Sequence, residues 1–192
     1  ETYCRRDFPM SGIRNLKKSD LDWFRERGQS IRLMMLSTAQ DDRYCCVVEP
    51  MALSVHSLEA NVPDNFNLTT LIGDTIGELK FYGQGAGKLP TASAVVADVI
   101  DAAKHRDEKK RMFWSEGGED VTVSPADLES AWYIRVAGTA EQAKAVFPDR
   151  ALLARAGAPE GEFALVTEPM TRGALDQRLA GLKPCSVFRV LD

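Results

Sequence analysis

A glycine-rich run that leads directly into a helical pattern is the feature that most limits the folds open to this chain. The run Gly83-Gln84-Gly85-Ala86-Gly87 holds three glycines within five residues, and glycine lets the backbone take positive φ or approach a neighbour closely. Pro90 has the φ of a first helical turn, and apolar residues then recur at helical spacing as far as Ala103. The sequence therefore predicts a strand, a glycine loop and a helix N-terminus, where free amides can receive an anion such as a phosphate.

Two common phosphate-binding motifs do not fit this run. A P-loop needs a glycine five positions before its Gly-Lys pair and a hydroxyl residue directly after it, whereas this chain has Tyr82 and Leu89 at those positions. The dinucleotide fingerprint G-x-G-x-x-G needs a third glycine where this chain has Lys88. Both motifs are therefore excluded, and the loop belongs to another kind of site.

The loop resembles the C-terminal signature of homoserine dehydrogenases, in which a strand ends in G-x-G-A-G and a T-A-[SA]-x-V helix follows. Residues 11–14, 21–34 and 67–83 also resemble segments of that family, in the same order and spacing. The resemblance implies the C-terminal portion of such an enzyme: the end of the catalytic and dimerisation domain plus an ACT-like domain, without the N-terminal Rossmann domain. We expect the family's cofactor fingerprint and its catalytic lysine and aspartate to lie upstream of Glu1.

The family interconverts L-homoserine and L-aspartate 4-semialdehyde with NADP or NAD, in threonine and methionine biosynthesis. The resemblance places the glycine loop near this cofactor, so the expected cofactor-binding residues are Gly83, Gly85, Ala86, Gly87 and Thr91. The alternatives are a turn that needs its glycines for shape only, and a Thr91 that merely caps the helix. No catalytic residue and no metal ligand is expected among these residues, and the isolated chain is expected to be inactive.

The predicted fold class is α+β, with a mixed β-sheet and packed helices followed by a small ferredoxin-like domain. The predicted division is a catalytic-domain part at residues 1–105, a linker at 106–128 and an ACT-like domain at 129–192. In the first part we expect a helix capped by Ser19, with strands at residues 31–36, 44–48, 67–72 and 76–82, the second of them stopped at Pro50. In the last part we expect a βαββαβ order with segments at residues 131–136, 140–146, 151–156, 162–167, 172–182 and 185–191.

The composition limits the classes of partner that this chain is expected to bind. The chain is 44% hydrophobic and 27% charged, as in soluble globular proteins, and its net charge is −4 with scattered basic residues, which argues against nucleic-acid binding. No apolar run approaches the roughly 18 residues of a membrane span, and no signal core is present, so a cytoplasmic location is expected. The resemblance implies a small-molecule substrate and a homodimer, and it implies that the apolar face of the helix after the loop lacks its natural partner in this chain.

Other interpretations stay open at this point. Residues 128–192 could form a non-catalytic module that senses threonine or another amino-acid effector, although the chain has Ala137-Gly138-Thr139-Ala140 where the ACT pattern has Asp-x-Pro-Gly. A dimerisation scaffold without ligand is a third interpretation. Lys88 either neutralises a cofactor phosphate or is solvated, and Glu49 either lines the substrate cleft or is an ordinary carboxylate at a strand end.

Overall fold

The structure is a computed structural model that describes residues 10–40, 43–108 and 121–191. The chain divides into two compact units, one formed by residues 1–60 with 116–192 and the other by residues 61–115. We call the first the sheet unit and the second the hairpin unit, and describe each by itself. No helix in the described ranges is long and apolar enough to cross a membrane.

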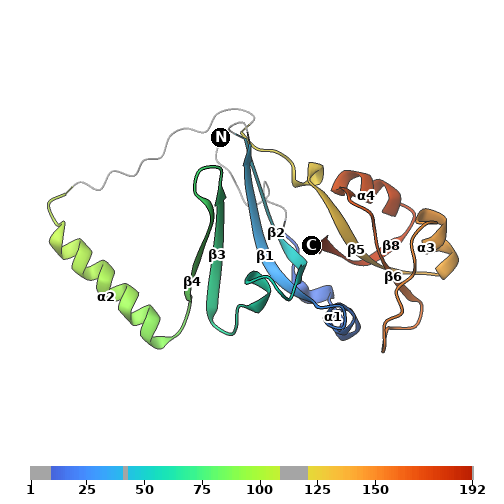
Figure 1. Ribbon diagram of the computed structural model, residues 1–192, viewed down its shortest axis with the longest axis horizontal. Coiled ribbons are helices and arrows are strands. Elements are labelled where there is room, and N and C mark those ends of the chain that lie inside the picture. The colour runs from blue at the N-terminus through green and yellow to red at the C-terminus, as the bar shows by residue number, and fades with distance from the viewer. Residues whose placement is uncertain (1–9, 41–42, 109–120, 192) are drawn as a thin grey trace. The chain divides into compact units, whose positions relative to one another are not determined.

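The sheet unit is built on one mixed sheet whose strand order is β1-β2-β8-β5-β6 (Figure 1). The short β7 pairs with the start of β5. Its strands are β1 (Gln29–Gln40), β2 (Arg43–Ser54), β5 (Glu129–Ala137), β6 (Glu162–Val166), β7 (Met170–Thr171) and β8 (Lys183–Val190). Its helices are α1 (Lys18–Arg25), α3 (Ala140–Val146) and α4 (Arg172–Leu179), with 3₁₀ turns at η2 (Ile13–Asn15), η3 (Glu59–Asn61) and η4 (Pro125–Asp127).

One edge of β2 joins segments from both ends of the chain. β1 pairs with the opposite edge of β2 in an antiparallel register along its whole length. On the edge of β2 away from β1, Thr122 bridges Tyr44, Met10 bridges Val48, and β8 pairs with the end of β2, all in parallel orientation. The domain boundaries at residues 105 and 129 stay a prediction, but the sheet runs across them.

Helices cover both faces of the sheet at β5. Successive strand residues point to opposite faces, so Trp132 and Ile134 pack with α3 and α4, where Leu175 is fully buried. Tyr133 lies on the other face and packs with Phe24 of α1, in a cluster that also holds an aromatic stack with Phe188. This burial of large apolar side chains on two faces gives the unit its own core.

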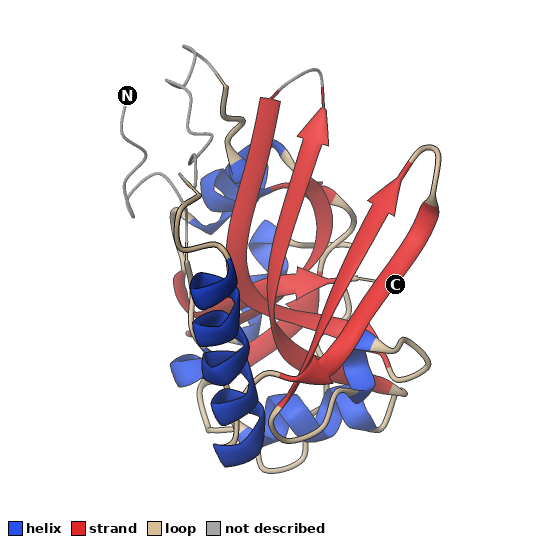
Figure 2. Cartoon of the chain, turned by 90° about the vertical axis from the view of Figure 1, so that its left-hand side faces the viewer, coloured by secondary structure: helices blue, strands red, loops and turns tan. Residues whose placement is uncertain are grey.

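The hairpin unit consists of β3 (Phe66–Gly73), β4 (Gly77–Gln84) and α2 (Lys88–Lys104). β3 and β4 pair in an antiparallel register, and α2 is a single uninterrupted helix (Figure 2). None of its described residues, 61–108, is buried. The apolar face of α2 is exposed, with Val99 at 63% and Leu89 at 79% exposure.

The predicted α+β class with a mixed sheet and packed helices is confirmed, but the predicted strand at residues 151–156 is wrong. That segment makes one strand-like bond, from Leu153 N–H to Ala164 O, and contains no strand. The Arg155 guanidinium in this segment donates a hydrogen bond to the Asp20 carboxylate. The chain then turns at Gly157, which has φ +68°. β5 lies between β8 and β6 and is antiparallel to both, which is the pairing that a split βαβ order requires. Within residues 129–191 the predicted order therefore lacks only its second strand, and the ACT-like domain stays a prediction.

Two local predictions in the first part are also wrong. Ser19 does not cap α1, because the helix begins at Lys18 and the Asp20 carboxylate accepts the Lys17 backbone N–H at 3.0 Å. Pro50 does not end β2, which continues to Ser54. Pro50 has no N–H to donate, and it is tolerated because it lies between the residues of β2 that meet Met10 and those that pair with β8.

Candidate functional site

The predicted cofactor loop lies where β4 passes into α2. Gly83 is still part of β4 and α2 begins at Lys88, so the loop proper is only three residues long. Gly87 is the residue before the helix and has φ +119°, a conformation that L side chains resist. Pro90 is the third helical residue, and its missing N–H costs little there because the first-turn amides have no partner within the helix.

Two asparagines hold this loop, one directly before β3 and one within it. Asn65 contacts it twice: its backbone oxygen accepts the Gly85 N–H at 2.9 Å, and its side-chain Nδ2 donates to the Ala86 oxygen at 2.5 Å. The Asn67 side chain fills the space beside Gly85, where a Cβ would lie 1.8 Å from Asn67 Nδ2. Gly85 and Gly87 therefore have reasons within the fold to be glycine. Neither asparagine was predicted to contact the loop, although Asn67 stands opposite Gly83 in the hairpin register.

Four consecutive amides remain available at the loop. The Thr91 N–H donates to the Gly87 oxygen at 3.0 Å, which is the first bond of the helix. The backbone N–H groups of Ala86, Gly87, Lys88 and Leu89 have no backbone acceptor in the described chain. Such unpaired amides at a helix N-terminus are suited to an anion.

This geometry changes the list of expected contact residues. The amides of Gly85 and Thr91 are used inside the fold, whereas those of Lys88 and Leu89, which were not predicted, are free of backbone bonds. The alternative that Thr91 caps the helix is wrong, since the helix begins after Gly87, four residues earlier.

Gly83 differs from the other two glycines of the run. A Cβ at Gly83 would meet no atom within 4 Å, and the residue has no positive φ. The described fold therefore does not require a glycine at position 83. Close approach of a ligand or of another surface would require one.

Glu49 does not line an open cleft. It is 5% exposed, and its carboxylate accepts the Nε–H of Arg189 from β8. Arg189 also donates to the Pro125 oxygen at 3.2 Å and lies 4.4 Å from the centre of the Trp132 ring. Burial raises the pKa of the neighbouring Cys45 thiol, an effect that the positive charge of Arg189 only partly opposes. The Glu49–Arg189 pair thus joins β2 to β8 inside the core.

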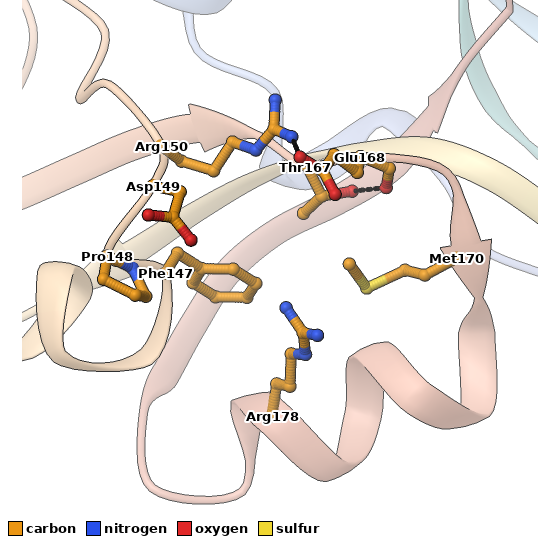
Figure 3. Close-up of a pocket in the computed structure, with 8 residues that line it drawn as sticks. All are labelled: Phe147, Pro148, Asp149, Arg150, Thr167, Glu168, Met170 and Arg178. Atoms are coloured by element: carbon orange, nitrogen blue, oxygen red, sulfur yellow. Dashed lines mark hydrogen bonds and ion pairs between the residues drawn. The ribbon is translucent and has the colours of Figure 1, made fainter.

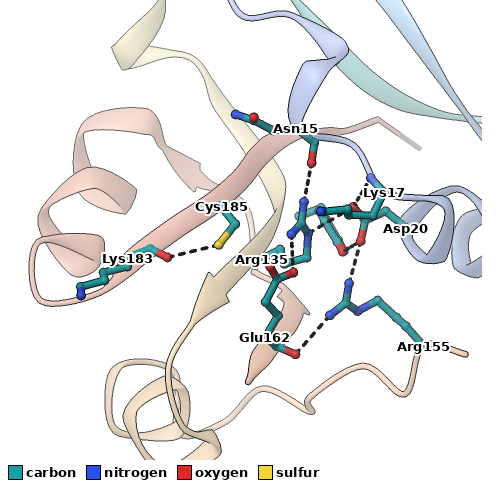
Figure 4. Close-up of polar contacts among 9 residues, drawn as sticks. Asn15, Lys17, Asp20, Arg135, Arg155, Glu162, Lys183 and Cys185 are labelled. Carbon is teal, nitrogen blue, oxygen red and sulfur yellow. Dashed lines mark hydrogen bonds and ion pairs between the residues drawn. The ribbon is translucent and has the colours of Figure 1, made fainter. Parts of the chain in front are cut away.

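A buried cluster around Asp20 is the largest polar feature that sequence reasoning missed (Figure 4). Asp20 is fully buried, and its carboxylate accepts the Tyr133 hydroxyl at 2.5 Å, the Arg155 guanidinium at 2.7 Å and the Arg135 Nε–H at 3.2 Å. Its sequence signal is weak, because Asp20 reads as an ordinary first-turn carboxylate until its distant partners are known.

The charges of this cluster balance. Arg135 also pairs with Glu162, so two guanidinium groups face two carboxylates. Burial acts to lower the pKa of Arg135, but the hydrogen bond to Glu162 and the charges of Asp20 and Glu162 outweigh it and raise that pKa. Burial, with the hydrogen bond to Asp20, raises the pKa of Tyr133 well above its usual range. The cluster joins α1 to β5 and β6, and its carboxylates are occupied by protein partners.

A shallow pocket of about 130 Å³ lies between the end of α3, the β6–β7 connection and α4 (Figure 3). Arg150 pairs with Glu168 at one side of it. Arg178 reaches into it from α4, with its guanidinium carbon 5.9 Å from the centre of the Phe147 ring. Asp149 lines the same pocket, so a cation and an anion from different segments face one small space.

Comparison with known proteins gives one family. A family model described as homoserine dehydrogenase matches residues 2–100, about half of the chain. The homoserine dehydrogenase of Helicobacter pylori is 31% identical over 128 residues, which cover 66% of this chain and 30% of that protein. That of Neisseria gonorrhoeae is 34% identical over 134 residues, which cover 66% and 31%. The chain thus spans about a third of the length of the curated relatives it matches.

Solved structures agree on the fold. A homoserine dehydrogenase from Thiobacillus denitrificans superposes with a TM-score of 0.74 at 21% identity, over 97% of this chain and 48% of that one. The Staphylococcus aureus homoserine dehydrogenase gives a TM-score of 0.65 at 24% identity, over 100% of this chain and 49% of that one.

Proposed function

The chain belongs to the homoserine dehydrogenase family, and on that premise we propose that it forms the C-terminal portion of an NAD(P)-dependent homoserine dehydrogenase. The reaction of the whole enzyme is the interconversion of L-homoserine and L-aspartate 4-semialdehyde, in threonine and methionine biosynthesis. The expected cytoplasmic location stays a prediction.

The glycine loop is the part of this chain that we assign to the cofactor. The assignment rests on two features that lie together. The amides of residues 86–89 have no backbone acceptor, and nothing in the fold requires the nearby residue 83 to be glycine. The amides would hold an anionic group of the cofactor, and Gly83 would let the cofactor approach the end of β4. The Lys88 side chain is exposed at the same place and can add positive charge. The nicotinamide, when bound, supplies hydride transfer.

This assignment is tested by a matched pair of glycine substitutions. At both Gly83 and Gly181 an added Cβ would meet open space, so neither substitution to alanine should disturb the fold. Titration of the ¹⁵N-labelled chain with NADPH should shift the amide signals of residues 86–89, and Gly83→Ala should weaken that binding about tenfold or more while Gly181→Ala leaves it unchanged. Equal NADPH affinity in the two variants would refute a cofactor role for Gly83.

Activity is proposed for the whole enzyme rather than for these residues alone. The family's cofactor fingerprint and catalytic lysine find no match in this chain, and the polar clusters of the sheet unit are occupied by protein partners. Purified residues 1–192 should therefore show no NADP- or NAD-dependent oxidation of L-homoserine. Turnover by the isolated chain would contradict the proposal that catalysis needs more of the enzyme than these residues.

We also propose that the chain dimerises through one face of β1 and β2. In the strand register Leu33, Met35 and Tyr44 share a face, and Met10 joins it through its bridge to Val48. The exposed fraction is 55% for Leu33, 68% for Met35, 54% for Tyr44 and 51% for Met10. A cluster of this kind marks an interaction surface, and Met35→Asp should shift the chain toward monomer in analytical ultracentrifugation.

An amino-acid effector is a second proposal, favoured by the pocket beside Phe147. Arg178 could receive a carboxylate and Asp149 an ammonium group, since both line one small space. If so, a ligand present at a hundred times its Kd would stabilise the sheet unit by about 2.7 kcal/mol. Thermal shift with L-threonine tests this, and Arg178→Ala should abolish the shift.

A further inference from the structure

We infer that Asn65 and Asn67 are positioning residues of the glycine loop, and that they aim its free amides outward toward the ligand. The inference rests on the proposed function, because it concerns how the proposed cofactor loop takes its shape. Neither asparagine needs to touch the ligand for this role.

Asn65 fixes the direction of one peptide plane. Its Nδ2 holds the Ala86 oxygen, and in a trans peptide the carbonyl and the following N–H point in opposite directions. The chain contains no cis peptide in its described residues. With the Ala86 oxygen bonded to Asn65, the Gly87 N–H must therefore point away from Asn65. A flip of this peptide would turn the Gly87 N–H toward the asparagine and remove it from the row of free donors.

The same residue fixes the start of the loop. The Asn65 backbone oxygen accepts the Gly85 N–H at 2.9 Å, so the chain is held on both sides of Ala86. Asn65 also lies close to Gly87, where an added Cβ would be 3.2 Å from Asn65 Nδ2. Asn65 thus bonds the backbone at both Gly85 and Ala86. The loop has no buried side chain that could hold it instead.

Asn67 lies two residues after Asn65, within β3. Its amide group occupies the volume beside Gly85, within 1.8 to 3.0 Å of where a Cβ would be. In the hairpin register it stands opposite Gly83, so it supports the loop on the side from which β4 arrives. A side chain at position 85 would displace Asn67. This packing therefore requires glycine at position 85.

The experiment measures NADPH binding by the ¹⁵N-labelled chain of residues 1–192, through the amide shifts of residues 86–89. Asn65→Ala should raise the Kd about tenfold, because one charge-facing donor is lost from the row and the loop must be reordered on binding. Asn67→Ala should raise it roughly three- to fivefold by loosening Gly85. Thr69→Ala is the matched control: Thr69 is exposed two residues further along β3 on the same face, and its variant should bind as the unchanged chain does.

A second readout separates positioning from folding of the hairpin. Cross-strand NOEs between Leu71 and Leu79, which face each other near the turn, should persist in all three variants. A weakened Kd with these NOEs intact supports the inference. An unchanged Kd in Asn65→Ala, or loss of the NOEs in that variant, would overturn it while NADPH binding by the unchanged chain left the proposed function standing. Absence of any NADPH-dependent shift in the unchanged chain would remove the cofactor role proposed for the glycine loop, and this inference with it.

Discussion

Two valines show how differently the two units of this chain are built. Val136 in β5 is 3% exposed and lies in the cluster between the sheet and its helices, whereas Val99 in α2 is 63% exposed. Both stand in regular, well-formed secondary structure. Isolated hairpins and single helices are marginal in water, so the hairpin unit has the local structure of a folded domain without the burial that stabilises one.

The polar groups of the two units follow the same division. In the sheet unit, Asp20 and Glu49 are buried with arginine partners from distant segments of the chain. In the hairpin unit, the amides at residues 86–89 have no backbone acceptor and the apolar face of α2 is exposed. The sheet unit thus pairs these buried carboxylates with its own arginines, whereas the hairpin unit leaves both its loop amides and the apolar face of its helix exposed. We therefore place the proposed cofactor contacts in the unit that lacks a core.

The largest expected effect comes from removing the Asp20 charge. Asp20→Asn leaves Arg135 and Arg155 buried with Glu162 as their one remaining carboxylate. Uncompensated buried charge typically costs about 3–5 kcal/mol. Urea unfolding followed by tryptophan fluorescence should show this loss, because Trp23 and Trp132 both lie in the sheet unit.

Asp22→Asn on the same helix is the control for this substitution. Asp22 pairs with Lys18 and Arg25 at the surface, and exposed pairs contribute about 0–1 kcal/mol. Equal losses at positions 20 and 22 would mean that the buried cluster does not set the stability of the sheet unit.

The next largest effect tests the core directly through Val136. Val136→Ala removes two buried methyl groups and leaves a cavity, so a loss of about 2 kcal/mol is expected. The urea midpoint should fall with the slope of the transition unchanged. A loss near zero would show that the cluster around Val136 repacks freely, and the contrast between the two units would then be weaker than their exposures suggest.

A smaller effect, with a pH dependence of known sign, is expected at Tyr133. Tyr133→Phe removes the hydroxyl that donates to Asp20, and one such bond contributes about 1–2 kcal/mol near neutral pH. The pKa of Tyr133 is raised in the folded state, so its contribution is fully present below the unfolded pKa of about 10 and is lost as the pH rises above that value.

The pH profile gives this prediction its control. Above about pH 10 the unchanged chain should lose stability more steeply than Tyr133→Phe, by up to ~1.4 kcal/mol per pH unit. Urea unfolding at a series of alkaline pH values checks it. Parallel profiles for the two proteins would show that Tyr133 ionises as readily in the folded state as in the unfolded one.

Local patterns predicted most of the elements and little of the site's detail. The glycine run and the apolar spacing of residues 91–104 predicted the loop and α2, because both depend on neighbours in sequence. The strand at 151–156 failed because Arg155 is held by Asp20, a contact across 135 positions. The Asn65 and Asn67 contacts to the loop were missed for a related reason: they depend on the register of a hairpin, which sets side chains of distant positions against each other.

The smallest expected effect has the opposite sign and concerns Val99. Val99→Ala makes the same change as Val136→Ala, but in a helix that buries no residue. Alanine has the higher helix propensity, so α2 should gain up to about 0.5 kcal/mol, seen as slower amide hydrogen exchange in the second half of the helix. Self-association measured by sedimentation should also weaken, since the apolar face becomes smaller. If Val99→Ala instead destabilises the chain as much as Val136→Ala does, the face of α2 is buried in solution, and its partner is already supplied by residues 1–192 themselves.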